Sequence, residues 1–398
     1  MHRRPLFACL YVTLAAIPAF GEAPPGWVYP SEAMAAKGDR MPWPVEVVRV
    51  ASGGVGVFVF EREVGLTLRW SKDGRAPWKV ILLPNGPAGE PVVEGDRVEI
   101  PLADEDDKSI SVAVFDLAQG KDLSRTRIPG ELKRPASFSR LVAREADRFL
   151  AWSTAPGDIF FSQTEDGGKK WRPLAVAGRT AARGDSCCPP LLIAADGPHL
   201  FFVGDDDKIS HKVADPAGVA WKDAAAVPLP APEQGLPALL AGAQSGSQFH
   251  LVLLTGKFRS LYTWSDDAGA HWAPWTVAAS PSQDVLGSFD VAATFRLKAR
   301  GKSAVLCWTE RGKREGDPYL CRMLASHTSG GKWSDFSPVA GIRGSSGLAA
   351  AYLGEDGGIT AAFATAPNVT TGTRYVLVRQ ALKGADPGEI PTAEWWGK

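Results

Sequence analysis

The chain has 398 residues, of which 45% are hydrophobic and 22% charged, and its 44 basic residues balance its 44 acidic ones. This composition is ordinary for a soluble globular protein, and a near-neutral chain without basic clusters argues against nucleic acid or an anionic membrane as partner. The 42 glycines and 31 prolines, with no long helical periodicity, favour many short strands joined by tight turns.

Residues 1–21 have the pattern of a secretory signal peptide. A basic start precedes an apolar run from Leu6 to Ala19, and small residues then offer a cleavage site after Gly21. No later run approaches the ~20 apolar residues of a membrane span. We therefore expect an exported protein, secreted or periplasmic, with an N-terminal extension over 22–41 and a single domain over 42–398.

An eight-residue pattern, Ser/Thr-x-Asp-x-Gly-x-x-Trp, recurs along the chain. Two copies match it fully, "TEDGGKKW" at Thr164–Trp171 and "SDDAGAHW" at Ser265–Trp272. Three weaker copies keep part of it: "SKDGRAPW" at Ser71–Trp78, "ADPAGVAW" at Ala214–Trp221 and "SHTSGGKW" at Ser326–Trp333. Each copy follows a short β-prone run, which predicts that each forms the turn of a β-hairpin.

Two further segments, "SISVAVFDLAQGKDLSRTRI" and "RYVLVRQALKGADPGEIPTAEW", share the strand–turn–strand layout without the pattern. The resulting seven hairpins are expected to start near residues 66, 109, 158, 208, 260, 319 and 374. Two earlier strands precede each hairpin, and a four-stranded repeat of ~50 residues is typical of a propeller blade. The sequence thus predicts an all-β fold, a single β-propeller of four-stranded antiparallel blades. Seven blades are favoured, and six with an irregular segment is the alternative.

The recurring residues have a structural role at the turn between the third and fourth strands. The Asp accepts backbone N–H bonds and closes the loop, the Gly adopts angles that other residues resist, and the Trp packs between neighbouring sheets. We assign these roles to the aspartates Asp73, Asp166 and Asp267 and to the tryptophans Trp78, Trp171, Trp272 and Trp333. The pattern resembles the Asp-box, or BNR repeat, of β-propellers in the sialidase (neuraminidase) superfamily.

The resemblance implies a catalytic set if the chain is a sialidase. The family's enzymes use an arginine triad for the substrate carboxylate, a Tyr–Glu nucleophile pair and an Asp acid/base. The candidates here are Tyr352, Asp158 and Glu310, although Tyr352 is also explained as a packed core residue. The family's Phe-Arg-Ile-Pro motif is matched in three letters by "TRIP" at Thr126–Pro129, which comes after the first Asp-box-like turn. This position departs from the family pattern, so the assignment of the first arginine of the triad is in doubt.

Propeller ligands usually bind at one end of the central channel, among the loops that join second to third strands and one blade to the next. These loops supply the candidate ligand-binding residues Arg183, Asp185, Cys187, Cys188, Arg259, Arg311, Arg343 and Arg374. The acidic runs "DEDDK" and "DDDK" also lie in such loops, and their carboxylates suit calcium. They lack the spacing of a known calcium loop and are better explained as solvated turns, so we expect no metal and no cofactor.

Four cysteines remain after signal cleavage, and an even number in an exported chain suggests disulfides. Cys307 and Cys321 flank one hairpin loop, and a symmetric hairpin would make them direct cross-strand neighbours that form a bridge. Cys187 and Cys188 in "DSCCPP" favour a vicinal disulfide, a rigid platform for a ligand at the channel mouth. A rigid loop without a ligand, a redox pair, a soft-metal site and two free thiols are the alternatives.

These observations favour an exported, sialidase-like Asp-box propeller that recognises a ligand, with a glycan as the leading class. An active exo-sialidase or related glycoside hydrolase is the first alternative, and a scaffold or partner-binding propeller of the cell envelope is the second. The chain offers no sign of nucleic acid binding or of a membrane span, and its oligomeric state is left open.

Overall fold

The computed structural model describes residues 27–28, 43–61, 65–73, 77–83, 89–103, 108–132, 138–153, 157–181, 190–215, 220–257, 259–279, 296–300, 303–310, 320–326, 333, 337–341, 345–353, 359–365 and 374–380. Within these residues the regular structure consists of 28 strands and a single 3-10 turn, η1 (Pro232–Gln234). None of the described elements is a helix that could cross a membrane.

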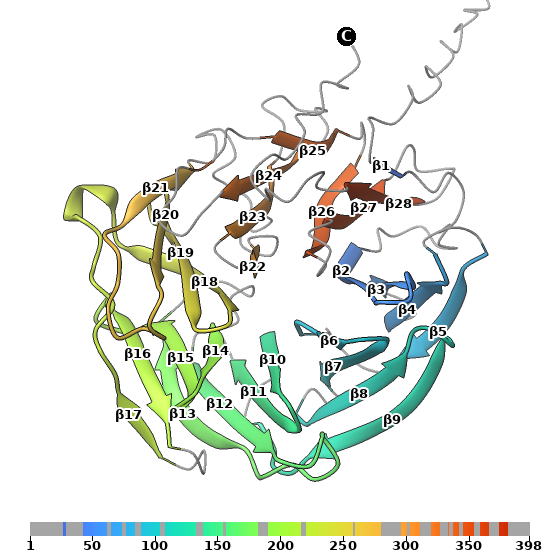
Figure 1. The fold of residues 1–398 in the computed structure, drawn as a ribbon, viewed down its shortest axis with the longest axis horizontal. Coiled ribbons are helices and arrows are strands. Elements are labelled where there is room, and N and C mark those ends of the chain that lie inside the picture. The colour runs from blue at the N-terminus through green and yellow to red at the C-terminus, as the bar shows by residue number, and fades with distance from the viewer. Residues whose placement is uncertain are drawn as a thin grey trace, which may run out of the picture.

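The strands form seven four-stranded antiparallel sheets in the described part of the chain. Figure 1 shows the sheets following one another around a ring, with the first strand of each nearest the centre. This arrangement is a β-propeller, as the sequence predicted, and we call its sheets blades 1 to 7.

Blades 1 to 3 are each built from four consecutive strands. Blade 1 contains β2 (Trp43–Arg49), β3 (Val55–Glu61), β4 (Gly65–Ser71) and β5 (Lys79–Leu83). Blade 2 contains β6 (Val92–Glu94), β7 (Arg97–Ala103), β8 (Ile110–Asp116) and β9 (Lys121–Ile128). Blade 3 contains β10 (Phe138–Arg144), β11 (Asp147–Ser153), β12 (Gly157–Thr164) and β13 (Ala175–Thr180).

Blades 4 to 6 repeat this plan. Blade 4 contains β14 (Leu191–Ala194), β15 (Gly197–Val203), β16 (Ile209–Ala214) and β17 (Trp221–Asp223). Blade 5 contains β18 (Pro237–Ser245), β19 (Gln248–Thr255), β20 (Ser260–Ser265) and β21 (Thr276–Ala279). Blade 6 contains β22 (Arg296–Arg300), β23 (Ser303–Glu310), β24 (Leu320–Ser326) and β25 (Ser337–Gly341).

Blade 7 combines the two ends of the chain. Its inner strands are β26 (Ser345–Leu353), β27 (Ile359–Thr365) and β28 (Arg374–Gln380). Its outermost strand is β1 (Trp27–Val28), which pairs antiparallel with β28. The C-terminal "EIPTAEW", which the strand–turn–strand layout would make the fourth strand, lies outside the described residues, and β1 from the predicted N-terminal extension occupies the outer edge of β28.

The third strand of every blade begins within one residue of its predicted start. The predicted period is therefore confirmed.

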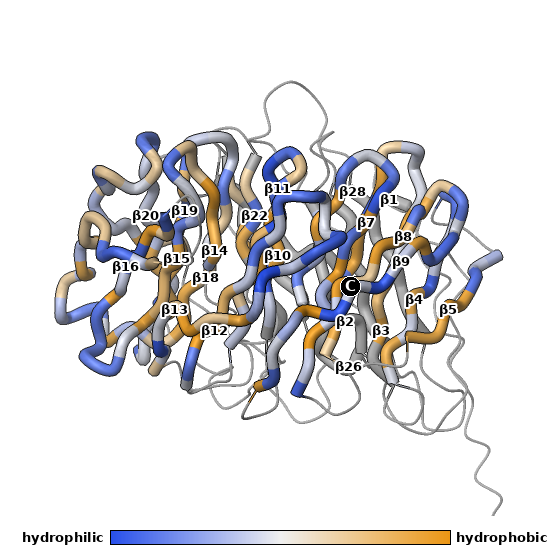
Figure 2. The backbone as a smooth tube through the Cα atoms, turned by 90° about the horizontal axis from the view of Figure 1, so that it is seen from below, coloured by the Kyte–Doolittle hydropathy of each residue, from blue (hydrophilic) through white to orange (hydrophobic). Residues whose placement is uncertain are grey.

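The hydrophobic core of the described chain lies between blades rather than inside any one of them. Five clusters of buried side chains each join two consecutive blades, from blades 1 and 2 through to blades 5 and 6. Strand β14 shows the reason, because successive side chains of a strand point to opposite faces of its sheet. Leu191 and Ile193 face blade 3, while Leu192 and Ala194 face blade 5. A sheet covered on both faces reads as a continuous apolar run, and Figure 2 shows hydrophobic stretches within the strands and hydrophilic ones in many turns.

The two complete copies of the repeated pattern form turns between third and fourth strands. In blade 3, Asp166 Oδ1 accepts the hydroxyl of Thr164 at 2.6 Å and the backbone N–H groups of Lys169 and Lys170 at 2.9 and 3.0 Å. In blade 5, Asp267 Oδ1 accepts the hydroxyl of Ser265 at 2.8 Å. The Asp closes each loop by collecting local donors, so its carboxylate is engaged in the turn and is not directed at a substrate.

The second complete turn needs its glycine for two reasons. Gly269 has φ +87°, and a Cβ at this position would lie 2.9 Å from Cε1 of the buried His211 in the preceding blade. Residues with a side chain resist this backbone angle, and the imidazole beneath leaves no room for one. In this copy the Gly therefore serves both the turn and the contact between blades, whereas a Cβ on Gly168 of the first complete copy would have no neighbour closer than 3.8 Å.

Three of the five tryptophans that end the repeats pack onto aromatic side chains of the preceding blade. Their rings meet edge to face at centroid distances of 4.9 Å for Trp221 on Phe161, 5.6 Å for Trp272 on Phe201 and 5.0 Å for Trp333 on Tyr262. This geometry is the one that aromatic quadrupoles prefer. Each Trp thus joins its own outer turn to the sheet before it.

The expectation that Cys307 and Cys321 lie directly opposite each other is wrong. The register of β23 and β24 places Cys307 opposite Met323 and Cys321 opposite Thr309. The last pair before the hairpin loop is Glu310–Leu320. The centre of the loop therefore lies one residue after the midpoint between the two cysteines. A diagonal pair has Cα atoms about 7–8 Å apart, which exceeds the usual span of a disulfide.

Candidate functional site

A cavity of about 240 Å³ lies among the first strands of blades 2 to 5. Its lining comes from the residues before and within β6, from β10, from β14 and from Gln244 of β18. Because first strands surround the centre of the ring (Figure 1), this cavity is part of the central channel. We call it the central cavity.

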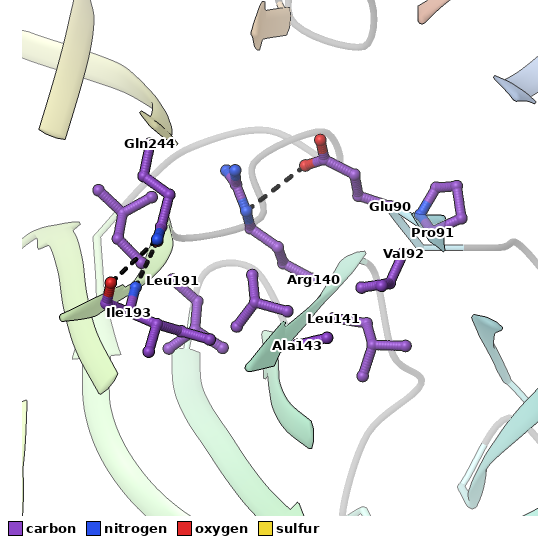
Figure 3. A pocket seen from close by; sticks show the side chains of 11 residues that line it. Glu90, Pro91, Val92, Arg140, Leu141, Ala143, Leu191, Ile193 and Gln244 are labelled. Carbon is purple, nitrogen blue, oxygen red and sulfur yellow. Dashed lines mark hydrogen bonds and ion pairs between the residues drawn. The ribbon is translucent and has the colours of Figure 1, made fainter. Parts of the chain in front are cut away.

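Charged side chains from three blades meet at the central cavity. The ammonium of Lys298 in blade 6 forms an ion pair with Oε1 of Glu90, the residue that precedes blade 2. The other carboxylate oxygen of Glu90 lies 3.5 Å from Nε of Arg140 in blade 3. Figure 3 shows the Glu90 carboxylate turned toward the Arg140 guanidinium. These three residues form an ion chain that crosses the ring.

Arg140 also reaches a blade that is not its neighbour. Its Nη1 donates to the carbonyl oxygen of Gly242 in blade 5 at 2.6 Å. Its Nε is buried and has no hydrogen-bond partner among the described residues, since 3.5 Å is long for a hydrogen bond. The side chains of Arg140, Glu90 and Lys298 are 12%, 16% and 22% exposed. Among the described residues, the Nε donor therefore has only this long contact with the Glu90 carboxylate.

Gln244 fixes the strand that lines the opposite side of the cavity. Its Nε2 donates to the carbonyl of Ile193 at 2.9 Å, and its Oε1 accepts the N–H of the same residue. The side-chain amide thus pairs with the backbone of β14 as another strand would (Figure 3). Strand β14 follows directly on the "DSCCPP" segment, so Gln244 holds the strand into which this loop leads.

Cations outnumber anions on the first strands that surround the channel. The basic residues in these described strands are Arg49, Arg140, Arg144, Arg296, Lys298 and Arg300, and the acidic ones are Glu46 and Glu94. Glu94 is bound to Arg148 on β11 at 2.6 Å. With Glu90 included, the sequences of the described first strands still carry more basic than acidic residues, which favours an anionic ligand.

The predicted catalytic residues lie at opposite ends of their blades. Tyr352 is half-buried and lies opposite Thr360, near the turn from first to second strand. Asp158 near the start of β12 and Glu310 at the end of β23 lie at the other end, beside the loops from second to third strands. The structure does not bring these three residues together, and their catalytic assignment stays a prediction.

Most predicted ligand-binding residues fall outside the described part of the chain. These are Arg183, Asp185, Cys187, Cys188, Arg311 and Arg343. Arg374 begins β28 at the loop end shared with Asp158. Arg259 is described, and its Nη1 donates to Oε1 of Gln234 in η1 at 2.8 Å. The vicinal disulfide therefore remains a prediction.

A buried pair of imidazoles forms a second polar cluster, in blade 4. His199 Nε2 lies 2.9 Å from Asp196 Oδ1, His199 Nδ1 lies 2.9 Å from His211 Nε2, and His211 Nδ1 lies 2.9 Å from the carbonyl oxygen of Ala225. Burial lowers the pKa of His199, and it lowers the pKa of His211 to about 4. The cluster lies under aromatic rings of blades 4 and 5, so we interpret it as part of the packing between blades.

Comparisons with known proteins give no close relative. No family model matches the chain, and no curated protein matches it. Among solved structures, YCF48 from Cyanidioschyzon merolae is 11% identical over 89% of this chain and 98% of its own, with a TM-score of 0.49. A mutant of Aleuria aurantia lectin in complex with α-methyl-L-fucoside is 12% identical over 75% and 95%, with a TM-score of 0.46.

A mutant of NanB sialidase from Streptococcus pneumoniae is also similar. It is 10% identical over 86% of this chain and 68% of its own, with a TM-score of 0.40. With TM-scores below 0.5, these likenesses carry no conclusion about what this chain binds.

Proposed function

We propose that this chain is an exported Asp-box propeller that binds an acidic glycan in the central cavity, with Arg140 as the principal contact. The two complete turns support the Asp-box assignment, because each Asp accepts the hydroxyl two residues before it. The predicted signal peptide supports export. The observation that carries the ligand proposal is the guanidinium of Arg140, which lines the cavity with its Nε unbonded.

The chemistry of the cavity supports an oxygen-rich, anionic ligand. A guanidinium presents planar N–H donors that match a carboxylate, and Gly242 occupies only one side of the Arg140 fork. The positive excess on the first strands would attract the ligand toward the channel. The cavity of about 240 Å³ is of the scale of a single sugar ring, so one acidic sugar unit is the group we expect to be recognised.

A binding experiment with matched sugars tests this proposal. Titration calorimetry would compare glucuronate with glucose and galacturonate with galactose, since each pair differs mainly in the carboxylate. We expect the acid of a pair to bind more tightly, and Arg140→Ala to weaken its binding by about tenfold or more, the effect of losing one charge-assisted contact. Arg179→Ala is the matched control, because Arg179 lies on the outer strand β13 and is 70% exposed.

Two results would overturn the proposal. One is the absence of binding of any of these sugars to the intact protein. The other is equal binding by the native protein and Arg140→Ala, which would place the ligand elsewhere.

A further inference from the structure

Glu90 occupies the position in the central cavity where a ligand carboxylate would bind. We propose that Glu90 is an internal competitor that sets the affinity and selectivity of the site, by holding Lys298 and Arg140 until the ligand displaces it. This inference rests on the proposed binding of an acidic glycan. It adds a specificity-determining residue and predicts the sign of the effect when the carboxylate is removed.

The contacts of Glu90 are those expected of such a competitor. Its Oε1 forms the close ion pair with Lys298, whereas its Oε2 lies 3.5 Å from Arg140 Nε without forming a hydrogen bond. The internal carboxylate therefore satisfies Lys298 well and Arg140 poorly. A free ligand carboxylate has no such tether, and it can approach the guanidinium at the shorter distance of a charge-assisted hydrogen bond.

The backbone at Glu90 is fixed, so displacement would need only the side chain to move. The N–H of Glu90 donates to the carbonyl of Ser139 at 3.1 Å, and the preceding Gly89 donates to Pro101 at 3.0 Å. A Cβ on Gly89 would lie 2.5 Å from the Ser139 carbonyl oxygen, which shows how closely this segment packs on blade 3. The Glu side chain has several rotatable bonds beyond this anchor.

The charges of the ion chain explain why Glu90 would compete strongly with a ligand anion. Two cations share one carboxylate, and all three side chains are more than three-quarters buried, so solvent screens their interaction less than it would at the surface. A ligand anion that enters while Glu90 remains meets a like charge nearby, and one that displaces Glu90 must break its pair with Lys298. Either event lowers the affinity of the native protein for an anion.

An alternative role for Glu90 predicts the opposite result. If its carboxylate accepted a hydroxyl of the bound sugar, removing the charge would weaken binding. If it competes with the ligand, removing the charge strengthens binding. A single substitution therefore separates the two.

The test is Glu90→Gln, with titration of the same uronate and hexose pairs. We expect the affinity for the uronate to rise by about tenfold or more, the size of one charged contact, while the affinity for the neutral hexose stays unchanged. Glu165→Gln is the matched control, since Glu165 is 62% exposed in an outer turn and pairs with Arg172. Its binding should equal that of the native protein.

A second variant, Glu90→Ala, guards against misfolding of the first, and thermal unfolding of each variant confirms that it is folded. Unchanged or weaker uronate binding in folded Glu90→Gln and Glu90→Ala, with the dependence on Arg140 intact, overturns this inference and leaves the proposed function standing. Failure of all sugars to bind the native protein overturns the proposed function and, with it, this inference.

Discussion

Two buried imidazoles in blade 4 show how a titratable residue is used for packing in this protein. His211 stacks on Phe201 at a centroid distance of 4.2 Å and is held by His199 and by the carbonyl of Ala225. Burial is the main reason that its pKa falls to about 4 from the ordinary 6.5. The ring is therefore neutral in the folded protein near pH 5, where an exposed histidine would be charged.

This shift makes stability depend on pH in a defined direction. Between pH 6.5 and about 4 the unfolded chain binds a proton that folded His211 does not, so the stabilisation is complete above pH 6.5 and is lost as the pH falls through this window. One pKa unit corresponds to about 1.4 kcal/mol, and we expect a loss that approaches about 3 kcal/mol. Urea unfolding at pH 7.5, 5.5 and 4.5 measures it.

Two variants identify the source of the loss. His211→Phe should give a flatter dependence on pH, because the ring no longer titrates. Val80→Ala should keep the native dependence, since Val80 is exposed and carries no titratable group. If the free energy of unfolding of His211→Phe fell with decreasing pH as steeply as that of the native protein, His211 would not be the source of the loss.

At the same scale, part of the central site could have been predicted from the sequence. The strand "RLKAR" carries a basic residue at every second position, among them Lys298, and "FSRLVAR" carries Arg140 and Arg144 at positions of the same face. Charged residues on one face of a first strand deviate from the apolar run of a covered sheet. Glu90 gives no such signal, because it precedes a three-residue strand and its partner Lys298 comes from four blades further along the chain.

At the scale of elements, the aromatic contacts between blades are the repeated unit of stability. Each of the three tryptophans meets a ring of the preceding blade at 84–86°. The indole therefore couples a turn on one sheet to strands on another. This coupling explains why the Trp is the most constant residue of the pattern. It is present in all five copies, including those that lack the Asp or the Gly.

A double-mutant cycle measures one of these contacts. Phe201→Leu, Trp272→Leu and the double variant should show a coupling of about 0.5–1.5 kcal/mol in the free energy of unfolding. The pair Phe161 and Trp272 is the control, because Phe161 packs on Trp221 instead, and its two substitutions should be additive within about 0.5 kcal/mol. Coupling of equal size in both pairs would show that the effect is not specific to the ring contact.

The hairpins also show what a sequence pattern can and cannot fix. The spacing of turns and apolar runs predicted the third strands correctly. Side-chain alternation fixes which residues of each strand face the core. The offset of Cys307 and Cys321 was missed because the nine residues between Glu310 and Leu320 contain several turn formers, Gly312, Gly316 and Pro318, and these do not specify which residues of the two strands pair. Register in a long loop depends on contacts that the sequence does not display.

At the scale of the whole molecule, the ring is closed by two residues from the other end of the chain. Trp27 pairs with Gln380 and Val28 with Arg379, and without them the outer edge of β28 would be open. An edge strand of this kind covers the outer edge of β28 and so protects the sheet from pairing with other chains. The sequence could not predict it, because a two-residue strand carries no alternation.

Truncation tests the closing strand. A protein that starts at residue 31 lacks β1, and we expect it to lose about 2 kcal/mol of stability, the value of two backbone hydrogen bonds at about 1 kcal/mol each. It should also be cleaved faster by a protease within blade 7. A protein that starts at residue 22 keeps β1 and is the control, and equal stability of the two would mean that β1 contributes nothing to closure.

The pairing of residues 27 and 380 also determines when this protein can finish folding. Six blades use strands that follow one another along the chain, so each can assemble from local contacts. Blade 7 cannot, since its edge strand β1 pairs with β28, the last of the described strands. Contacts between distant parts of a chain form slowly, and the first of the described strands is therefore expected to be the last to find its partner.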